Sequence, residues 1–469
     1  MHLASFRSVV AVAIGVAALA GCQSYQSSPL DPEAYESSWR LRTPSDEAVR
    51  AFAARLAEEG LADAPPFDPD DGLSIPEAEL VALVFNPDLR LARLRAGVAQ
   101  ATAEHAGRWD DPTFSIDVLR ITESVANPWV ITPGLAITIP ISGRLAAEKA
   151  RANAAVSVEL DRLAEAEWRI RRDVRLTWAE WSAARLKYEE LQQFVDSMKS
   201  LTESTGQLAE SGELPRTEAA LFSIEQMQRA YELRRLGGDV AVLEQHLRTL
   251  LGLSPEAPIQ FTPILSLGVT ADSEVGDVAS RNLSLARLRQ EYEVAEQTLR
   301  REIRKQYPDL TIGPLYETDQ GQSRIGFLGA IPIPILNANR QGIAEATAER
   351  EVARAAFETQ LERIIGAIAA MRARATALRE EREQITDHLA PLIDRQLDDA
   401  RRLLEFGESG GLVLLESLVR AHNTKLHLID VRLDESRAHI ELDYLTGPTP
   451  AADPKSINPA AESASEVTQ

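Results

Sequence analysis

The stretch that decides the fold is Gly134–Ile141, which reads GLAITIPI. Its large aliphatic side chains fall on every second position, so an extended strand there would carry one aliphatic face and one small or polar face. A second stretch, GAIPIPI at 329–335, repeats the alternation. Each stretch leads directly into a very long helical segment, from Arg144 or from Arg340. A strand-to-helix join that occurs twice indicates an internal duplication.

Other landmarks support this duplication. The sequence LARLR at 91–95 recurs letter for letter at 285–289, an offset of 285 minus 91, or 194. Pro140 and Pro334 have the same offset, and Pro112 and Pro308 are 196 residues apart. Each half is therefore predicted to contain a short helix, a strand hairpin, a long helix, a tight turn and a return helix.

Four strands are predicted, at 112–121 and 129–141 in the first half and at 308–316 and 323–336 in the second. The alternation places one set of apolar side chains on a common face that we expect to touch lipid: Phe114, Ile116, Val118, Leu135, Ile137, Ile139, Leu310, Ile312, Ile331 and Ile333. Continuous helical stripes predict long helices at 144–205 and 341–404, with a kink at Pro391, and return helices at 216–251 and 412–445.

The composition is typical of long helices, with 44% apolar, 5% aromatic and 26% charged residues. The net charge of -21 disfavours nucleic acid as a partner.

The N-terminus has the layout of a secretory signal, and the run Leu19-Ala-Gly-Cys22 resembles the bacterial lipobox. We therefore expect lipidation, including palmitate, at Cys22, and Gln23 at the next position favours sorting to the outer membrane.

The domain organisation follows from these patterns. We expect a signal peptide at 1–21, an irregular leader at 22–72 with one helical candidate at 46–60, the first repeat at 73–252, a Pro-rich linker at 253–271, the second repeat at 272–447 and a disordered tail at 448–469. After signal cleavage no helix looks suited to a bilayer, so a membrane crossing would have to use the strands. Four strands cannot close a barrel, whereas three copies would supply 12 strands around a lumen.

In the order of its elements, repeated twice, the chain resembles the TolC-type outer-membrane efflux family. The resemblance covers about 73–447 and lies in Asn86-Pro87 before the first strand, in Pro140-Ile141 followed by Gly143-Arg144, and in the segment from Gly407 to Leu415-Glu416-Ser417. It implies a mainly α-helical fold with a transmembrane β-barrel contribution: a trimeric 12-stranded barrel on an α-helical tube. The implied partners are outer-membrane lipid, a periplasmic adaptor and an inner-membrane transporter, for which the resemblance favours the RND type.

The implied function is a passive exit duct of a tripartite efflux pump in a Gram-negative outer membrane. Two alternatives stay open: the outer-membrane channel of a type I secretion system, and a lipid-anchored periplasmic coiled-coil scaffold without a pore. Gene neighbourhood would separate the two pump types, and bilayer conductance would separate a duct from a scaffold. No catalytic triad, phosphate loop or zinc motif is present, so we expect neither enzymatic activity nor a cofactor or metal.

The resemblance also implies roles for particular residues. Glu416 matches a position where the family often carries an acid that narrows the periplasmic aperture, and three copies would form an acidic ring. The family's second acid is replaced by Val413, and a solvated helix glutamate is the competing interpretation. Glycines are expected where the helical hairpins reverse direction, and neighbouring residues are expected to dock the adaptor: Gly206, Gly212, Leu214, Gly407, Ser409, Gly410, Gly411 and Leu412. The spacing of His422, His427 and His439 does not place them together as metal ligands.

Overall fold

The computed structural model describes residues 24–58, 67–69, 72–265, 278–406 and 411–448. The signal peptide, Cys22 and most of the predicted tail lie outside these residues. Contacts divide the chain into two units, Met1–Arg42 and Thr43–Gln469. The first unit contains α2 (Pro32–Arg40), a helix that the expected irregular leader did not include. Asp31 caps this helix by accepting a hydrogen bond from the Ala34 N–H at 3.0 Å, and Pro32 occupies its first turn.

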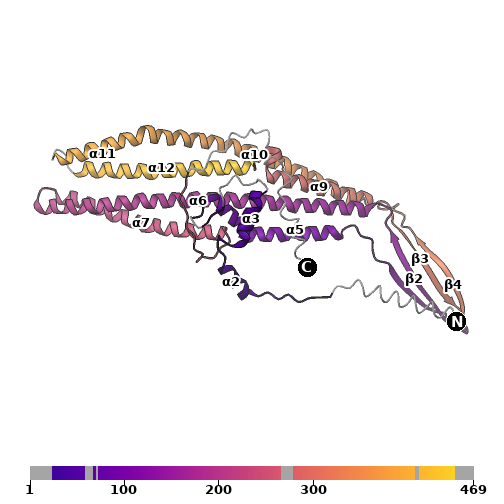
Figure 1. Ribbon diagram of the computed structural model, residues 1–469. Coiled ribbons are helices and arrows are strands. Elements are labelled where there is room, and N and C mark those ends of the chain that lie inside the picture. Colours follow the sequence, from indigo (N-terminus) through magenta and orange to yellow (C-terminus); the bar gives the residue numbers. More distant parts are fainter. Residues whose placement is uncertain (1–23, 59–66, 70–71, 266–277, 407–410, 449–469) are drawn as a thin grey trace. The chain divides into compact units, whose positions relative to one another are not determined.

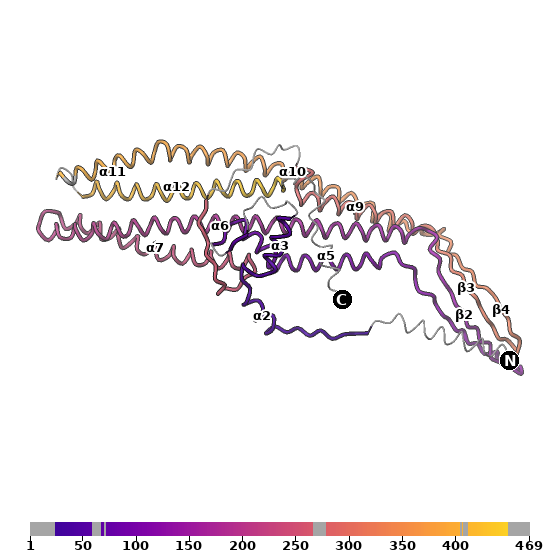
Figure 2. Tube along the Cα trace, in the orientation of Figure 1, coloured from indigo at the N-terminus to yellow at the C-terminus, as the bar shows by residue number. Residues whose placement is uncertain are grey.

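The second unit contains the repeated elements (Figures 1 and 2). The first half has α3 (Glu47–Glu58), α4 (Ile75–Phe85), α5 (Pro87–His105), β1 (Thr113–Arg120), β2 (Trp129–Ile139), α6 (Arg144–Ser211) and α7 (Arg216–Leu250). The second half has α8 (Val278–Arg281), α9 (Leu283–Arg304), β3 (Leu310–Asp319), β4 (Gln322–Ala330), α10 (Arg340–Gln384), a π-helical turn η2 (Ile385–Leu389), α11 (Ala390–Glu405) and α12 (Gly411–Thr446).

Helix α6 is the central element of this unit. It has 68 residues, which corresponds to about 100 Å at 1.5 Å per residue. It packs against α4, α5, α7, α9 and α12, and the strands lie beyond the end where α6 begins (Figure 1). The predicted long helix of the second half is interrupted, because η2 separates α10 from α11 and ends two residues before Pro391. Proline lacks the N–H that a regular helix needs, so the predicted kink has a local cause.

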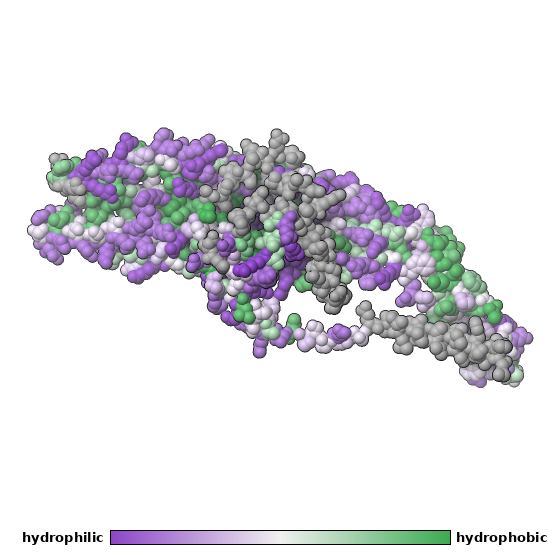
Figure 3. All heavy atoms as spheres, viewed as in Figure 1, coloured by the Kyte–Doolittle hydropathy of each residue, from purple (hydrophilic) through white to green (hydrophobic). Residues whose placement is uncertain are grey.

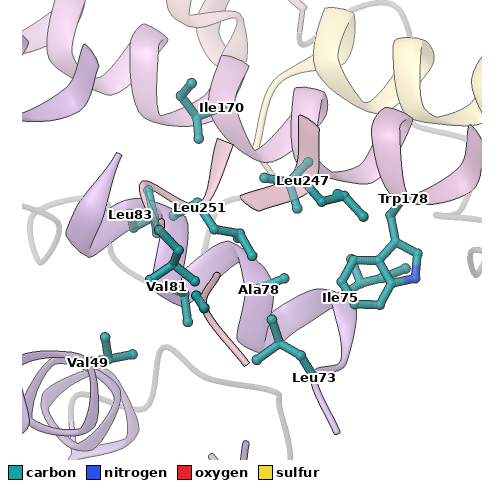
Figure 4. Close-up of a cluster of buried hydrophobic side chains, with 14 of the residues drawn as sticks. Val49, Leu73, Ile75, Ala78, Val81, Leu83, Ile170, Trp178, Leu247 and Leu251 are labelled. Atoms are coloured by element: carbon teal, nitrogen blue, oxygen red, sulfur yellow. The ribbon is translucent and has the colours of Figure 1, made fainter. Parts of the chain in front are cut away.

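The main core forms where α4 lies across α6 and the end of α7 (Figure 4). Trp178 of α6 is fully buried there, and its indole N–H donates to the Thr262 carbonyl at 3.1 Å. Its ring makes edge contacts with Trp181 and Phe261, with centroids 6.0 and 5.2 Å away. An indole whose polar atom is satisfied stabilises a core without leaving an unpaired donor.

The internal duplication extends to hydrogen bonds. The Asn86 side chain caps α5 by accepting from the backbone N–H groups of Asp88 and Leu89, and its amide donates to the Leu250 carbonyl at 2.8 Å. Asn282 repeats the arrangement in the second half: it accepts from the Leu285 N–H and donates to the Leu445 carbonyl, also at 2.8 Å.

The structural offset between the halves is 282 minus 86, or 196. Leu89 and Leu285 are therefore equivalent, and both are fully buried. Leu91, which the LARLR match pairs with Leu285 at an offset of 194, is 48% exposed. The letter match is thus displaced by two residues from the structural repeat at this point.

Candidate functional site

The strands form one antiparallel sheet in the order β1-β2-β3-β4. Residues directly opposite each other on antiparallel strands project to the same face. The register pairs Phe114 with Leu135, Ile137 with Ile312, and Pro314 with Phe327. Eight of the predicted lipid-facing residues therefore share one sheet face: Phe114, Ile116, Val118, Leu135, Ile137, Ile139, Leu310 and Ile312.

Two of the predicted residues are not in the sheet. β4 ends at Ala330, so Ile331 and Ile333 lie beyond it, although both side chains are exposed. Pro332 and Pro334 alternate with them and cannot donate ladder hydrogen bonds, which explains the early strand end. The fourth strand instead places Ile325 and Phe327 on the apolar face, at 87% and 68% exposure.

The opposite sheet face carries polar side chains. The hydroxyls of Thr138 and Thr311 lie 3.1 Å apart on adjacent strands. Arg324 of β4 forms ion pairs with Glu317 at 2.9 Å and Asp319 at 3.2 Å. One face is thus almost wholly apolar, whereas the other mixes these polar side chains with Leu119 and Leu328, which are 64% and 47% exposed. Hydrophobic residues gather over the strands on the side shown in Figure 3.

An ion-pair network fixes the junction between strands and helices. The Arg144 guanidinium at the start of α6 contacts Asp309 at 2.7 Å and Asp110 at 2.8 Å, so it joins residues that precede β3 and β1. Farther along α6, Glu148 contacts Arg151 and, from α9, Arg301. Hydrogen bonds from Arg151 lower the pKa of Glu148 to about 2, so this carboxylate remains charged well below neutral pH.

The turn between α6 and α7 is only partly as predicted. Gly212 follows the last residue of α6 with a φ of 82°, and the N–H groups of Glu213 and Leu214 both donate to the Leu208 carbonyl. This is a glycine helix stop. The prediction for Gly206 is wrong, because α6 continues through it to Ser211 without a turn. A single glycine weakens a helix by about 1 kcal/mol, which the packing of a long helix overrides.

In the other hairpin, Gly407, Ser409 and Gly410 lie outside the described residues. Gly411 is the first residue of α12, and a Cβ there would meet the Phe222 ring at 3.2 Å. Close packing rather than a positive φ therefore accounts for this glycine. Leu412 is 44% exposed, and Leu214 is half-buried.

Glu416 lies on the exposed surface of α12. Its carboxylate accepts a hydrogen bond from Arg420 at 2.7 Å, one helical turn away, and both side chains are more than half exposed. Within one chain the charge of Glu416 is therefore accompanied by a cation. An apolar and charged groove runs between α11 and α12 beside it, with Leu392, Leu403, Val413 and Arg420 among its lining residues.

A cluster links the two helical hairpins. Phe194, Met198 and Phe222 of α6 and α7 pack against Leu415, Leu418 and Val419 of α12. Beside them, the ring of His422 is 2% exposed and stacks on Phe194 with centroids 4.3 Å apart. Arg229 donates to Asn423 at 3.3 Å, and Lys425 pairs with Glu190 at 3.0 Å.

His422 is a buried residue that the sequence pattern did not identify. Neither ring nitrogen has a hydrogen-bond partner, and its Nδ1 lies 3.8 Å from a Glu190 oxygen. Burial, together with the cations Arg229 and Lys425, lowers the pKa of His422 to about 4. Among the residues that the structure describes, no group of three or more His, Cys, Asp or Glu side chains could hold a metal ion.

Comparison with solved structures shows several matches over most of the chain. The outer membrane protein VceC from Vibrio cholerae is 18% identical, with a TM-score of 0.69 over 80% of this chain and 96% of that chain. The outer-membrane channel OprN is 14% identical, with a TM-score of 0.71 over 91% and 98%. The CmeC outer membrane channel of Campylobacter jejuni is 12% identical, with a TM-score of 0.68 over 91% and 94%.

The chain therefore has the fold of outer-membrane channels, and the resemblance to TolC-type efflux factors is confirmed at the level of fold. OprN and CmeC are outer-membrane channels, and VceC is an outer membrane protein. No family model and no curated protein matches the sequence. Within the described part of the chain, no helix combines the length and apolarity needed to cross a membrane.

Proposed function

We propose that this chain is the outer-membrane exit duct of a tripartite efflux pump. It passively conducts small molecules or ions from an inner-membrane transporter of the RND type, through a periplasmic adaptor, to the exterior. The observation that carries the proposal is the sheet, which exposes a continuous apolar face and ends in two unpaired edge strands, β1 and β4. An exposed apolar face fits hydrocarbon, and open edges in lipid require partner strands.

The helices support the same assembly. In one row, α5 packs on α6, α6 on α9 and α9 on α10, and in another, α7 packs on α6, α6 on α12 and α12 on α11. Both rows begin with first-half elements and end with second-half elements, as the sheet does. The outer helices expose apolar side chains, for example Leu94 of α5 at 64% and Val352 of α10 at 69%.

Three copies placed head to tail would bring the first-half edge of one chain against the second-half edge of the next. Such a heterologous contact closes into a ring when the rotation is correct. The trimer has 12 strands around a polar lumen lined by Thr138 and Thr311, and a helical tube below it. Cys22 carries the lipid anchor, with palmitate among its acyl chains, in the outer membrane of a Gram-negative bacterium.

In this assembly the helical hairpins point into the periplasm and form the docking ends. Gly212 and Leu214 mark one hairpin, and Leu412 marks the other. Glu416 is the candidate aperture acid, and its pairing with Arg420 predicts a weaker cation preference than an unpaired acidic ring would give.

The test uses detergent-solubilised full-length protein, native mass spectrometry and planar bilayers. We expect a three-chain complex that conducts ions. Leu94→Glu should reduce the trimer fraction, because it places a charge in an apolar contact between copies. Ile303→Glu is the matched control and should leave the trimer intact, because Ile303 is 39% exposed on α9, a helix that packs between α6 and α10 and is not at an edge of the row.

A water-soluble monomer after Cys22→Ser, with no conductance, would instead establish the scaffold lipoprotein. Crosslinking in cells then identifies the partners. Recovery of an adaptor with an RND transporter agrees with the proposal, whereas recovery of an ABC exporter assigns the chain to type I secretion.

A further inference from the structure

The apolar sheet face carries one charged side chain. The register places Arg120 on the same face as Phe114, Ile116 and Val118, directly opposite Trp129. The remaining members of this face in the described strands are uncharged: Ile131, Pro133, Leu135, Ile137, Ile139, Leu310, Ile312, Pro314, Tyr316, Thr318, Ser323, Ile325, Phe327 and Gly329. A charge at the border of an apolar surface requires a counter-charge or water.

The Arg120 side chain contacts an aromatic ring but no carboxylate of the described residues. Its guanidinium carbon lies 5.7 Å from the centre of the Trp129 ring, which orients the side chain by a cation–π contact. Among the described residues, no carboxylate forms an ion pair with Arg120. Arg324, at the same end of the sheet but on the opposite face, has two such partners in Glu317 and Asp319.

The position of Arg120 along the strand matches a membrane interface. β1 has eight residues, or about 27 Å at 3.4 Å each, close to the apolar band of an outer-membrane protein. Arg120 and Trp129 lie at the hairpin end, next to the Ile121 N–H that donates to the Pro128 carbonyl. Trp109, 56% exposed, precedes β1 at the other end. Tryptophan and arginine at such a border place their polar atoms among lipid headgroups.

We propose that Arg120 and Trp129 form a binding site for the phosphate of an anionic lipid headgroup. The inference rests on the proposed function, because it requires the apolar face to touch lipid. A guanidinium fits phosphate through two parallel hydrogen bonds, and the indole ring keeps it in place. In the proposed trimer the adjacent β4 contributes Ser323, Ile325, Phe327 and Gly329 to this face, so a neighbouring copy supplies no acid either.

The test compares full-length protein in nanodiscs of phosphatidylcholine alone and of phosphatidylcholine mixed with phosphatidylglycerol. Native mass spectrometry measures how much phosphatidylglycerol each complex retains after release into detergent. Arg120→Gln should lower retention by about tenfold, the effect of losing a charge-assisted hydrogen bond. Arg324→Gln is the control and should retain as much as the unchanged protein. A separate arm adds inorganic phosphate, which should not displace the lipid, because the acyl chains contribute to binding.

Equal retention by Arg120→Gln and the unchanged protein, or an equal loss in Arg324→Gln, would overturn the site. Displacement by inorganic phosphate would show a simple anion site and would also overturn the assignment to lipid. Flotation with phosphatidylcholine vesicles separates this inference from the proposed function. Protein that floats but has no preference for phosphatidylglycerol removes only the Arg120 site, whereas protein that does not float with any vesicle removes the exit duct as well.

Discussion

Acidification should weaken the contact between α12 and the α6–α7 hairpin, because His422 lies buried in that contact. Burial is the first cause of its low pKa, and the positive charges of Arg229 on α7 and Lys425 on α12 add to it. The Glu190 carboxylate on α6 is the nearby acid, and it is already paired with Lys425. Protonation would place a charge against the Phe194 ring with no hydrogen-bond acceptor in place.

The size of the effect follows from proton linkage. The ring has a pKa of 6.5 when it is free and about 4 when it is packed, so the packed state binds fewer protons between these values. The free energy of the contact is fully present above about pH 6.5 and decreases as the pH falls toward 4. Between pH 7 and pH 5 the loss is about 2 kcal/mol, which increases the open population by a factor on the order of 20.

Hydrogen exchange with mass spectrometry measures this opening directly. Peptides that cover 411–430 are followed at pH 7 and pH 5, with exchange times corrected for the intrinsic rate. The unchanged protein should lose protection at pH 5. His422→Phe should remove most of this loss, because phenylalanine keeps the stack on Phe194 and does not titrate.

His427→Phe provides the matched control on the same helix. His427 is exposed and lies 3.1 Å from Glu381, so this change should leave the pH dependence in place. The reasoning is refuted if His422→Phe and the unchanged protein lose equal protection, or if only His427→Phe abolishes the loss.

The remaining predictions concern packing in the second unit. Gly252→Ala should destabilise the α4–α7 contact by more than 1 kcal/mol in chemical unfolding, because Gly252 has a φ of 69° and a Cβ would lie 2.1 Å from the Phe85 carbonyl oxygen. Gly238→Ala, inside α7 with nothing within 4 Å of the added atom, should instead stabilise by up to about 1 kcal/mol. Trp178→Ala should cost about 3–5 kcal/mol, measured as the shift of the denaturation midpoint at constant slope, and an effect under 1 kcal/mol would contradict its assignment to the core.

Local pattern was sufficient to predict the alternation of strands and helices. The apolar alternation at Leu135, Ile137 and Ile139 predicted a strand, and β2 contains all three. The pattern did not predict the end of β4, because the alternation continues past Ala330 although the prolines there cannot join a ladder. Ile325 and Phe327 have the same odd-numbered spacing as Ile331 and Ile333, so the signal for the correct pair was present.

Features that depend on contacts distant in the sequence could not be predicted. His422 is spaced on α12 like a surface histidine, and only the packing of α6 and α7 buries it. Asn86 and Asn282 could be recognised as helix caps, but their bonds to Leu250 and Leu445 depend on how each return helix ends. Contacts distant in the sequence also explain why the LARLR match has an offset of 194 while the structural repeat has an offset of 196. Equivalent positions in the two halves are those that are buried in the same way, not those that carry the same letter.

The contrast between α6 and its second-half counterpart has a mechanical consequence. α6 is unbroken from Arg144, beside the sheet, to Ser211 at the hairpin turn, so no interruption of its backbone hydrogen bonds offers an easy point for bending. In the second half, the π-helical turn Ile385–Leu389 interrupts the long helix between α10 and α11. The altered hydrogen-bond pattern of this turn and the nearby Pro391 lower the resistance to bending there. A force on the second hairpin should therefore be absorbed at this turn, while the same force on the first hairpin should reach the base of the strands.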